Sequence, residues 1–422
     1  MNKPQQNFWK SLGPGILFAG AAIGTSHLVQ STRAGAMFGL GLLGIIIFAN
    51  VIKYPAYRFG PHYAAATGKS LIDGYRSLGT WVVVLIGLIE FPVMAIIISA
   101  TAITTAAIFL AIFNLSWDAR YIGCLLIFLA GGLTLSGGYS LLDKLTKIFV
   151  LILTVCTFVA TAIAVQNVEF NFLLSIEDLN FETFVFVIAL IGFMPAGMEL
   201  SIIHSLWTVE KIKKTSGGIS IKAATLDLNI GYVLSATLAV FFVVMGSSVM
   251  YSEQIEPATS AAAFANQIIS LYTTTLGEWS GTVVGLAALS VMFTTLLTVL
   301  DGMPRLLSKI LESLELNNSA VNQKETATNH PPYFLLTIFS IAILAVSILI
   351  FLMRNFTSFI DFVTIVSFLV APVIAVLNHL VIFGKTVAID KRPRNLMRIW
   401  SLLAIVFLVT LSLCYFYFLI FN

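Results

Sequence analysis

Charged residues are scarce in this sequence. Asp, Glu, Lys and Arg make up 10% of its 422 residues and 58% of the residues are hydrophobic, whereas a soluble globular chain averages about 25% charged residues. This composition excludes an ordinary soluble protein. The net charge of +3 follows from the membrane topology described below, and we expect no nucleic-acid partner.

Cysteines and catalytic motifs are lacking as well. The three cysteines, Cys124, Cys156 and Cys414, lie within apolar runs at no metal-ligand spacing. We expect them to be small packing residues without a disulfide framework. No nucleophile–base set, glycine-rich phosphate loop or paired metal-ligand motif lies outside the apolar runs. We therefore expect neither an enzyme nor a bound cofactor.

Long apolar runs, in contrast, recur from end to end. Each is long enough for a helix to cross a bilayer, which predicts an all-α integral membrane protein that spans the cell membrane many times. The eleven runs are residues 12–30, 38–57, 81–113, 121–140, 147–165, 181–207, 228–249, 281–300, 334–353, 359–383 and 399–421. Between them, residues 253–276 predict an amphipathic surface helix, and residues 312–332 a flexible cytoplasmic loop.

The placement of positive charge predicts the orientation of these runs. With the N-terminus in the cytoplasm, only Arg33, Arg120 and Arg354 of the 23 Lys and Arg residues fall outside the inside loops, which leaves 20 inside. Lys53 is counted among those 20. The bias follows the positive-inside rule and predicts a cytoplasmic N-terminus and an extracytoplasmic C-terminus.

Two of the apolar runs are interrupted in the middle. The first interruption is Gly24-Thr25-Ser26-His27 and the second is Met194-Pro195-Ala196-Gly197. A break at mid-membrane frees backbone groups that lipid cannot satisfy, so it is tolerated only where those groups line a cavity or meet a ligand. Paired breaks in corresponding positions of two halves indicate the substrate site of a secondary transporter.

Each break also has a purely structural interpretation. Ser and Thr hydroxyls can bond back to their own helix and bend it, and Pro195 with Gly197 can kink a helix for packing alone. His27 favours a functional role at the first break, because a buried histidine is costly in a membrane. Met194 offers the second break a thioether, which suits softer transition metals better than hard cations.

Glu90, Glu199 and His204 are candidates for proton coupling. Glu199 lies just past the second break, His204 follows five residues later, and Glu90 lies in the third run. An unpaired carboxylate at mid-bilayer is expensive, so each should face a cavity or a partner, or stay protonated. For Glu90, a hydrogen bond to backbone freed by a nearby proline is an equal alternative. For Asp301 and Asp361, near the ends of runs, we expect interfacial solvation.

Several motifs resemble the Nramp family of divalent-metal transporters. They are Pro14-Gly15, residues 34–40 (AGAMFGL), Ala49-Asn50, Ala66-Thr67-Gly68-Lys69, Met194-Pro195 and His204-Ser205. The resemblance implies a LeuT-like fold of two inverted five-helix repeats, about residues 12–165 and 181–386, in a single transport domain (residues 1–422). An additional eleventh helix spans about residues 399–421. It also implies import of manganese or iron, usually with protons.

The departures from the family pattern fall on its metal-binding motifs. In an ungapped match, Gly24 stands at the family's metal-binding Asp and His27 at its Asn. Ala196 replaces the His of the family's Met-Pro-His motif, and Thr364 stands where the tenth helix of the family carries Gln. Of the acidic series on the third helix only Glu90 remains. Loss of the metal carboxylate removes a Coulomb term on the order of several kcal/mol.

Two functions follow as expectations. The first is an Nramp-type secondary transporter of divalent metal cations with altered selectivity and weakened proton coupling, and the alternative is a carrier of a small organic or anionic solute with the same fold. The partners are the transported ion or solute and the lipid bilayer, and the sequence does not indicate an oligomeric state.

The same reasoning gives the expected site residues. Substrate should bind between the breaks, and a metal should be ligated there by Thr25, His27 and Met194. The expected substrate-binding residues are Ala22, Gly24, Thr25, Ser26, His27, Ile191, Met194, Ala196, Gly197 and Thr364.

Overall fold

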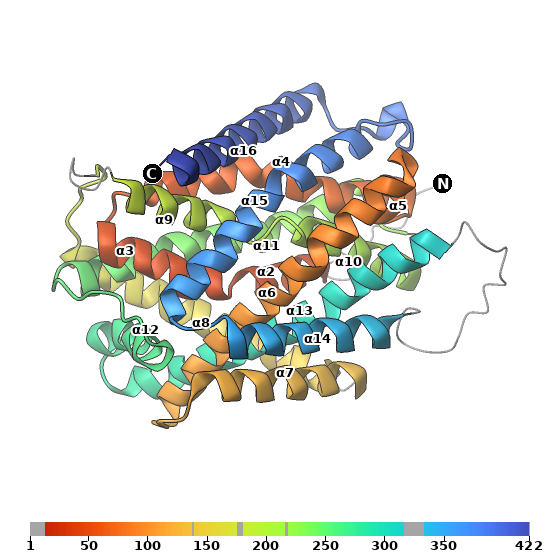
Figure 1. Cartoon of the computed structure of the whole chain (residues 1–422). Coiled ribbons are helices and arrows are strands. Elements are labelled where there is room, and N and C mark those ends of the chain that lie inside the picture. Colours follow the sequence, from red (N-terminus) through yellow and green to blue (C-terminus); the bar gives the residue numbers. More distant parts are fainter. Residues whose placement is uncertain (1–12, 137–138, 175–179, 216–217, 316–332, 422) are drawn as a thin grey trace, which may run out of the picture.

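Helices make up most of the chain that the structure describes. The computed structural model describes residues 13–136, 139–174, 180–215, 218–315 and 333–421 (Figure 1), with the backbone alone at 139–147. In these ranges we find fifteen α-helices. They are α2 (Pro14–Ala22), α3 (Thr32–Phe38), α4 (Leu43–Thr67), α5 (Leu71–Leu78), α6 (Thr80–Ile112), α7 (Ala119–Ser136), α8 (Tyr139–Ala164), α9 (Phe181–Gly192), α10 (Leu200–Lys214), α11 (Ile221–Gly246), α12 (Ala261–Leu276), α13 (Trp279–Glu315), α14 (Phe334–Phe351), α15 (Phe356–Ile382) and α16 (Asn395–Phe421).

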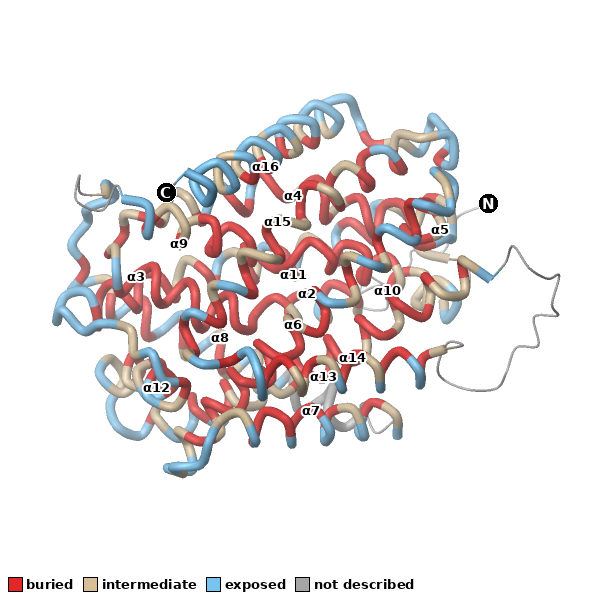
Figure 2. The backbone as a smooth tube through the Cα atoms, viewed as in Figure 1, coloured by how far each residue is buried: buried red, intermediate tan, exposed pale blue. Residues whose placement is uncertain are grey.

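The helices account for all eleven apolar runs. Eight segments of the described chain are long and apolar enough to cross a membrane: those of α6, α7, α8, α11, α13, α14, α15 and α16. The remaining three runs are α4 and two interrupted helices, α2 with α3 and α9 with α10. Figure 2 shows the outer faces of α7 and α16 exposed, and large apolar side chains such as Leu125, Phe128 and Leu403 are among the exposed residues there. Such faces suit contact with lipid.

Three boundaries differ from the sequence predictions. The second helix, α4, begins later and continues to Thr67 through Pro55 and Pro61. The predicted surface helix begins at Ala261 and packs one face, with Phe264 and Ile268, into the protein. The first four residues of the predicted loop, 312–315, belong to α13, which ends at Glu315. The rest of that loop lies outside the described residues.

The first interrupted helix is held against α11 by close backbone contact. The Asp227 carboxylate of α11 accepts hydrogen bonds from the amides of Gly13 (3.0 Å) and Gly15 (2.7 Å), at the start of α2. A side chain at Gly15 would collide with the Asp227 carbonyl, and one at Gly231 with the Gly15 carbonyl. Two glycines and a carboxylate thus fix where α2 enters the bundle.

Candidate functional site

The first break lies where the sequence predicted it. The α-helix α2 ends at Ala22, and the chain resumes as a π-helical turn over Ser26–Ser31 before α3. π-Helical turns inside α-helices are frequent at functional sites. The carbonyls freed here are bonded within the chain: the Ser26 hydroxyl donates to the Ala22 carbonyl (2.7 Å), and the amides of His27 and Leu28 donate to the Gly24 carbonyl (both 3.1 Å).

The second break is longer. The helix α9 ends at Gly192 and α10 begins at Leu200, with a cis peptide bond between Met194 and Pro195. The two breaks meet directly, because the Ser26 hydroxyl also lies 3.3 Å from the Pro195 carbonyl. Residues 169 positions apart are therefore adjacent, as the pairing of the two interruptions predicted.

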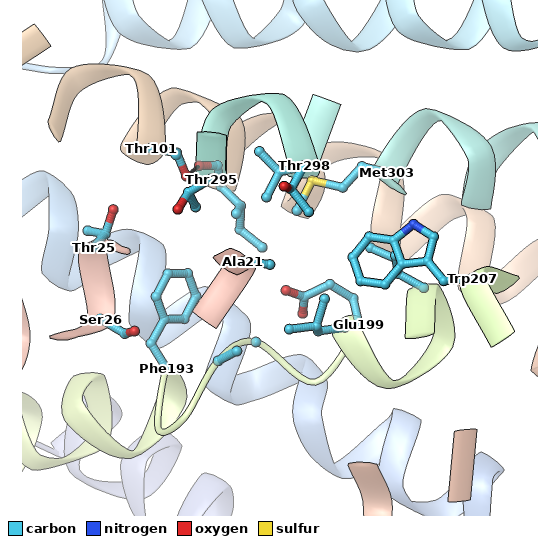
Figure 3. Close-up of a pocket in the computed structure, with 16 residues that line it drawn as sticks. Ala21, Thr25, Ser26, Thr101, Phe193, Glu199, Trp207, Thr295, Thr298 and Met303 are labelled. Atoms are coloured by element: carbon cyan, nitrogen blue, oxygen red, sulfur yellow. Dashed lines mark hydrogen bonds between the residues drawn. The ribbon is translucent and has the colours of Figure 1, made fainter. Parts of the chain in front are cut away.

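A pocket lies between the breaks. Its volume is about 40 Å³, and a water molecule needs about 10–15 Å³ of such space, so the pocket has room for about three water molecules. Figure 3 shows Phe193 and Glu199 of the second break on one side and Thr295 and Thr298 of α13 on the other. It is lined by Ala21, Thr25, Ser26, Ile97, Thr101, Phe193, Ala196, Gly197, Glu199, Leu200, Ile203, Trp207, Thr295, Thr298, Val299 and Met303.

The pocket includes five of the residues singled out from the sequence, which are Thr25, Ser26, Ala196, Gly197 and Glu199. The other residues singled out do not line it: Ala22, Gly24, His27, Glu90, Ile191, Met194, His204 and Thr364. The sequence reasoning missed the walls contributed by α6 and α13, including Thr101, Thr295 and Met303. Their helices are uninterrupted at these positions, so no local sequence signal marks them.

The ring of His27 is occupied by protein groups. Its Nδ1 lies 2.6 Å from the Ser26 hydroxyl, and its Nε2 lies 2.9 Å from the Ser235 carbonyl and 3.0 Å from the Ser235 hydroxyl. The side chain is fully buried. Neither nitrogen is free to ligate a metal in this arrangement, so the geometry gives His27 the role of joining the first break to α11.

The sequence prediction for Lys53 was wrong. The residue was counted in an inside loop, but it lies within α4 and is fully buried. Its ammonium contacts three carbonyls of the second break: Ile191 (2.9 Å), Gly192 (3.0 Å) and Ala196 (3.4 Å). The Tyr57 hydroxyl also donates to the Ala196 carbonyl. The Ile191 carbonyl, an expected substrate ligand, is therefore bound by the chain's own cation.

The two buried glutamates differ in their surroundings. Glu199 lines the pocket at the start of α10 and interacts electrostatically with Lys53. Glu90, on α6, is fully buried, and neither of its carboxyl oxygens has a hydrogen-bond partner. The alternative that Glu90 bonds to freed backbone is therefore wrong for this conformation. An unpartnered buried carboxyl favours the neutral, protonated form. His204 is buried on α10, five residues after Glu199. Its Nδ1 lies 3.4 Å from the Thr208 hydroxyl, and its Nε2 has no hydrogen-bond partner.

A polar cluster joins α3 to α15. Arg33 forms an ion pair with Asp361 (2.6 Å) and donates to the Gln30 side chain (2.8 Å), and its guanidinium lies over the Phe186 ring of α9. Gln30 also donates to Thr364, at 3.1 Å. Asp361, for which we expected interfacial solvation, is partly exposed (24%), but it is also paired with a buried arginine that the sequence did not indicate. The cluster ties both interrupted helices to α15.

Asp301, for which we expected interfacial solvation, is partly exposed (24%). It accepts a hydrogen bond from Arg305, one turn on in α13, at 2.8 Å. Its carboxylate is thus paired within its own helix.

We expect Asp361→Ala to lower the melting temperature of the purified protein by several degrees. The Arg33 side chain is only 8% exposed, and removal of one partner strands a buried charge, at a cost of about 1–3 kcal/mol. Asp118→Ala is the matched control, because the Arg120–Asp118 pair is 39% and 36% exposed and should contribute about 0–1 kcal/mol. Equal shifts in both variants would contradict a structural role for the cluster.

These features together define a class of protein. Two interrupted helices meet at a buried polar pocket inside an all-helical membrane bundle, which is the architecture of a LeuT-like secondary transporter. A family model described as natural resistance-associated macrophage protein-like matches residues 15–418. The chain belongs to this family, Nramp, which consists of transporters and not of enzymes. An uncharacterized protein of Pasteurella multocida (strain Pm70) is 31% identical over 421 residues, which cover 97% of this chain and 94% of that protein.

Solved structures show the same fold. The manganese transporter of Eremococcus coleocola, in complex with an aromatic bis-isothiourea substituted compound, has a TM-score of 0.68 at 13% identity, and the match covers 98% of this chain and 88% of that one. MhsT in complex with L-phenylalanine has a TM-score of 0.64 at 12% identity, with 95% and 98% covered. These likenesses confirm the LeuT-like fold that the sequence predicted.

Proposed function

We propose that this Nramp-family transporter carries a small organic solute, bound in the pocket between the two breaks, by alternating access. The observation that carries the proposal is the position of Lys53. Its ammonium already occupies the carbonyls at the end of α9, where unwound backbone would otherwise hold a cation.

The donor set supports the same conclusion. Gly24 supplies no carboxylate, both nitrogens of His27 are engaged, and Met194 is fully buried outside the pocket. Among the described residues, no group of three His, Cys, Asp or Glu side chains is arranged to hold a metal ion. A dehydrated divalent cation needs anionic oxygen or several good donors, and the expected triad of Thr25, His27 and Met194 does not converge on one point of the pocket.

The pocket lining favours a solute with both polar and apolar parts. Hydroxyls of Thr25, Ser26, Thr101, Thr295 and Thr298 and the carboxylate of Glu199 offer hydrogen bonds. The rings of Phe193 and Trp207 offer apolar contact. A cavity of about 40 Å³ restricts the bound part to a few non-hydrogen atoms in this conformation. The same fold holds an organic solute in MhsT, in complex with L-phenylalanine.

A divalent metal is the second candidate. The observation in its favour is that Glu199 and the Met303 thioether line the same pocket, which gives one hard and one soft donor. The similarity of the fold to that of a manganese transporter also supports a metal substrate. In this case the metal ligands would be Glu199 and Met303 with the threonine hydroxyls, and not the triad expected from the sequence.

Coupling and orientation complete the proposal. Glu90 and Glu199 are the proposed proton carriers, and His204 is a further candidate. Proton coupling is weak because the third helix keeps only one residue of the family's acidic series.

We propose a cytoplasmic N-terminus and an extracytoplasmic C-terminus. Lys53 is buried in a helix and no longer counts as a loop residue, which leaves 22 of the 23 Lys and Arg. Of these 22, all except Arg33, Arg120 and Arg354 fall in the cytoplasmic loops, so 19 residues support this orientation. Protease digestion of a C-terminal tag in intact cells tests this orientation.

A binding screen tests the substrate. We expect the melting temperature of purified protein to rise with at least one organic solute among amino acids, organic acids, amines and sugars, and not with manganese. Thr101→Val should weaken binding of that solute by about two- to tenfold, the value of one hydrogen bond.

Thr105→Val is the matched control for this variant. Thr105 lies one turn along the same helix and makes the same hydrogen bond to its own backbone, but it does not line the pocket. It should therefore leave the affinity unchanged. Stabilisation by metals alone, or equal effects of the two valines, would overturn the organic-solute proposal.

A further inference from the structure

The contacts of Lys53 amount to complete coordination of an ammonium group. A lysine ammonium has three N–H donors and no acceptor. Here three carbonyl oxygens lie within 3.4 Å of Nζ, all from the second break. The side chain is fully buried, and the Tyr57 ring lies 5.9 Å from Nζ. Each of the three N–H donors therefore has a carbonyl acceptor, and the carbonyls surround the ammonium group as they would surround a bound cation.

The partner carbonyls form a cation site in their own right. Ile191 and Gly192 end α9, and their carbonyls project from the C-terminal end of that half-helix. This end carries partial negative charge from the helix dipole and favours a positive group. In secondary transporters, half-helix C-termini and unwound carbonyls are the groups that coordinate a coupling cation.

We propose that Lys53 is a built-in cation, which replaces a bound inorganic cation at the second break and makes the carrier independent of one there. The chain supplies the positive charge from α4, 138 residues away from the Ile191 carbonyl that it binds. The charged group that acts on it is Glu199, at the other end of the break, and the neutral ring of Tyr57 lies beside it. This inference holds whichever solute the pocket takes, because two of the three carbonyls, those of Ile191 and Gly192, belong to residues that do not line the pocket.

The proposal predicts that a removed charge can be replaced from solution. Lys53→Ala removes the positive charge from the three carbonyls and leaves a space of lysine length beside them. The Ile191 carbonyl keeps the Met194 amide (3.2 Å) and the Ala196 carbonyl keeps the Tyr57 hydroxyl, so what is lost is chiefly the cation. In choline chloride its melting temperature should fall on the order of 5 °C below that of the wild type. Methylammonium or sodium chloride at equal ionic strength should restore at least half of this loss, with saturation as concentration rises. The wild type should melt at the same temperature in all three salts.

Two control variants separate charge from packing. Lys53→Met fills the same space with apolar atoms, so it should be destabilised equally in the three salts and show no recovery. Lys309→Ala removes a lysine whose partners, Asp73 and Glu312, are partly exposed, and it should not distinguish methylammonium or sodium from choline.

Three results would overturn the proposal. They are an equal loss for Lys53→Ala in every salt, recovery of Lys53→Met to the same extent, and failure to recover folded Lys53→Ala from any of the salts. The last would show that the carbonyls need the lysine chain itself and not its charge. None of these readouts depends on solute transport, so failure here and failure of the proposed function are separate results.

Discussion

Replacement of Glu199 by Gln should abolish the weak proton-linked uptake that remains in this carrier, while leaving a folded protein. Glu199 is the one carboxylate that lines the described pocket, and it interacts electrostatically with Lys53 across the break. A proton that enters the pocket can be held at its carboxyl group, and the amide of Gln cannot accept it. The measurement is the internal pH of proteoliposomes during uptake, which should no longer fall.

Glu90→Gln should have a similar but smaller effect. The Glu90 carboxyl is buried without a hydrogen-bond partner, so a neutral amide of the same shape should preserve the fold while removing the proton site. Glu182→Gln is the control, because Glu182 is exposed in the first turn of α9. Robust acidification that neither Glu199→Gln nor Glu90→Gln abolishes would contradict the assignment of these two residues.

A gain of metal binding is the second large effect that we expect. Gly24→Asp should place a carboxylate beside Thr295, since a side chain at Gly24 would approach the Thr295 methyl group to 3.0 Å. Thr295 lines the pocket with Glu199 and Met303. Two carboxylates and a thioether form a donor set for manganese. A new charge about 4 Å from the ion contributes about 4 kcal/mol at a screened dielectric, so we expect manganese affinity to rise by at least tenfold.

The contact with Thr295 has to be relieved for a fair test. The variant should therefore be made in a Thr295→Ser background, which removes the crowded methyl group and keeps the hydroxyl. Gly20→Asp is the control. Gly20 lies on α2, four residues before Gly24, and a Cβ added there meets no atom within 4 Å. This variant therefore measures how far an added negative charge attracts manganese without ligating it. Calorimetry with manganese compares three proteins: Thr295→Ser alone, Thr295→Ser with Gly24→Asp, and Thr295→Ser with Gly20→Asp. Equal manganese affinities of the Gly24→Asp and Gly20→Asp proteins would contradict the alignment of Gly24 with the family's metal carboxylate.

The helices and the breaks were predictable because their signals are local. Apolar runs give the spans, and glycine or proline beside polar or small residues at matching places in two runs predicted the interruptions at Gly24 and at Met194-Pro195. Proline alone is not such a signal, because α4 continues through Pro55 and Pro61. The surface helix that ends at Leu276 and the meeting of the two breaks followed from the same patterns, and the structure confirms both.

The roles of individual side chains were not predictable in the same way. Lys53 near the end of an apolar run is typical of an interfacial lysine, and its partners lie 138 residues or more away along the chain. The ring contacts of His27 with Ser235 and the pairing of Arg33 with Asp361 are also long-range. Such pairings depend on tertiary packing, which a single sequence does not encode in any local pattern.

The most direct test of the account is calorimetry of the wild-type protein with manganese. Lys53 is the proposed built-in cation at the second break, and no group of three His, Cys, Asp or Glu side chains in the described part of the chain is arranged to hold a metal ion. It therefore predicts no saturable manganese heat, under conditions where a stabilising organic solute gives a saturable signal. Saturable one-to-one manganese binding that is lost in both His27→Ala and Met194→Ala would contradict it, because those two side chains would then ligate the metal.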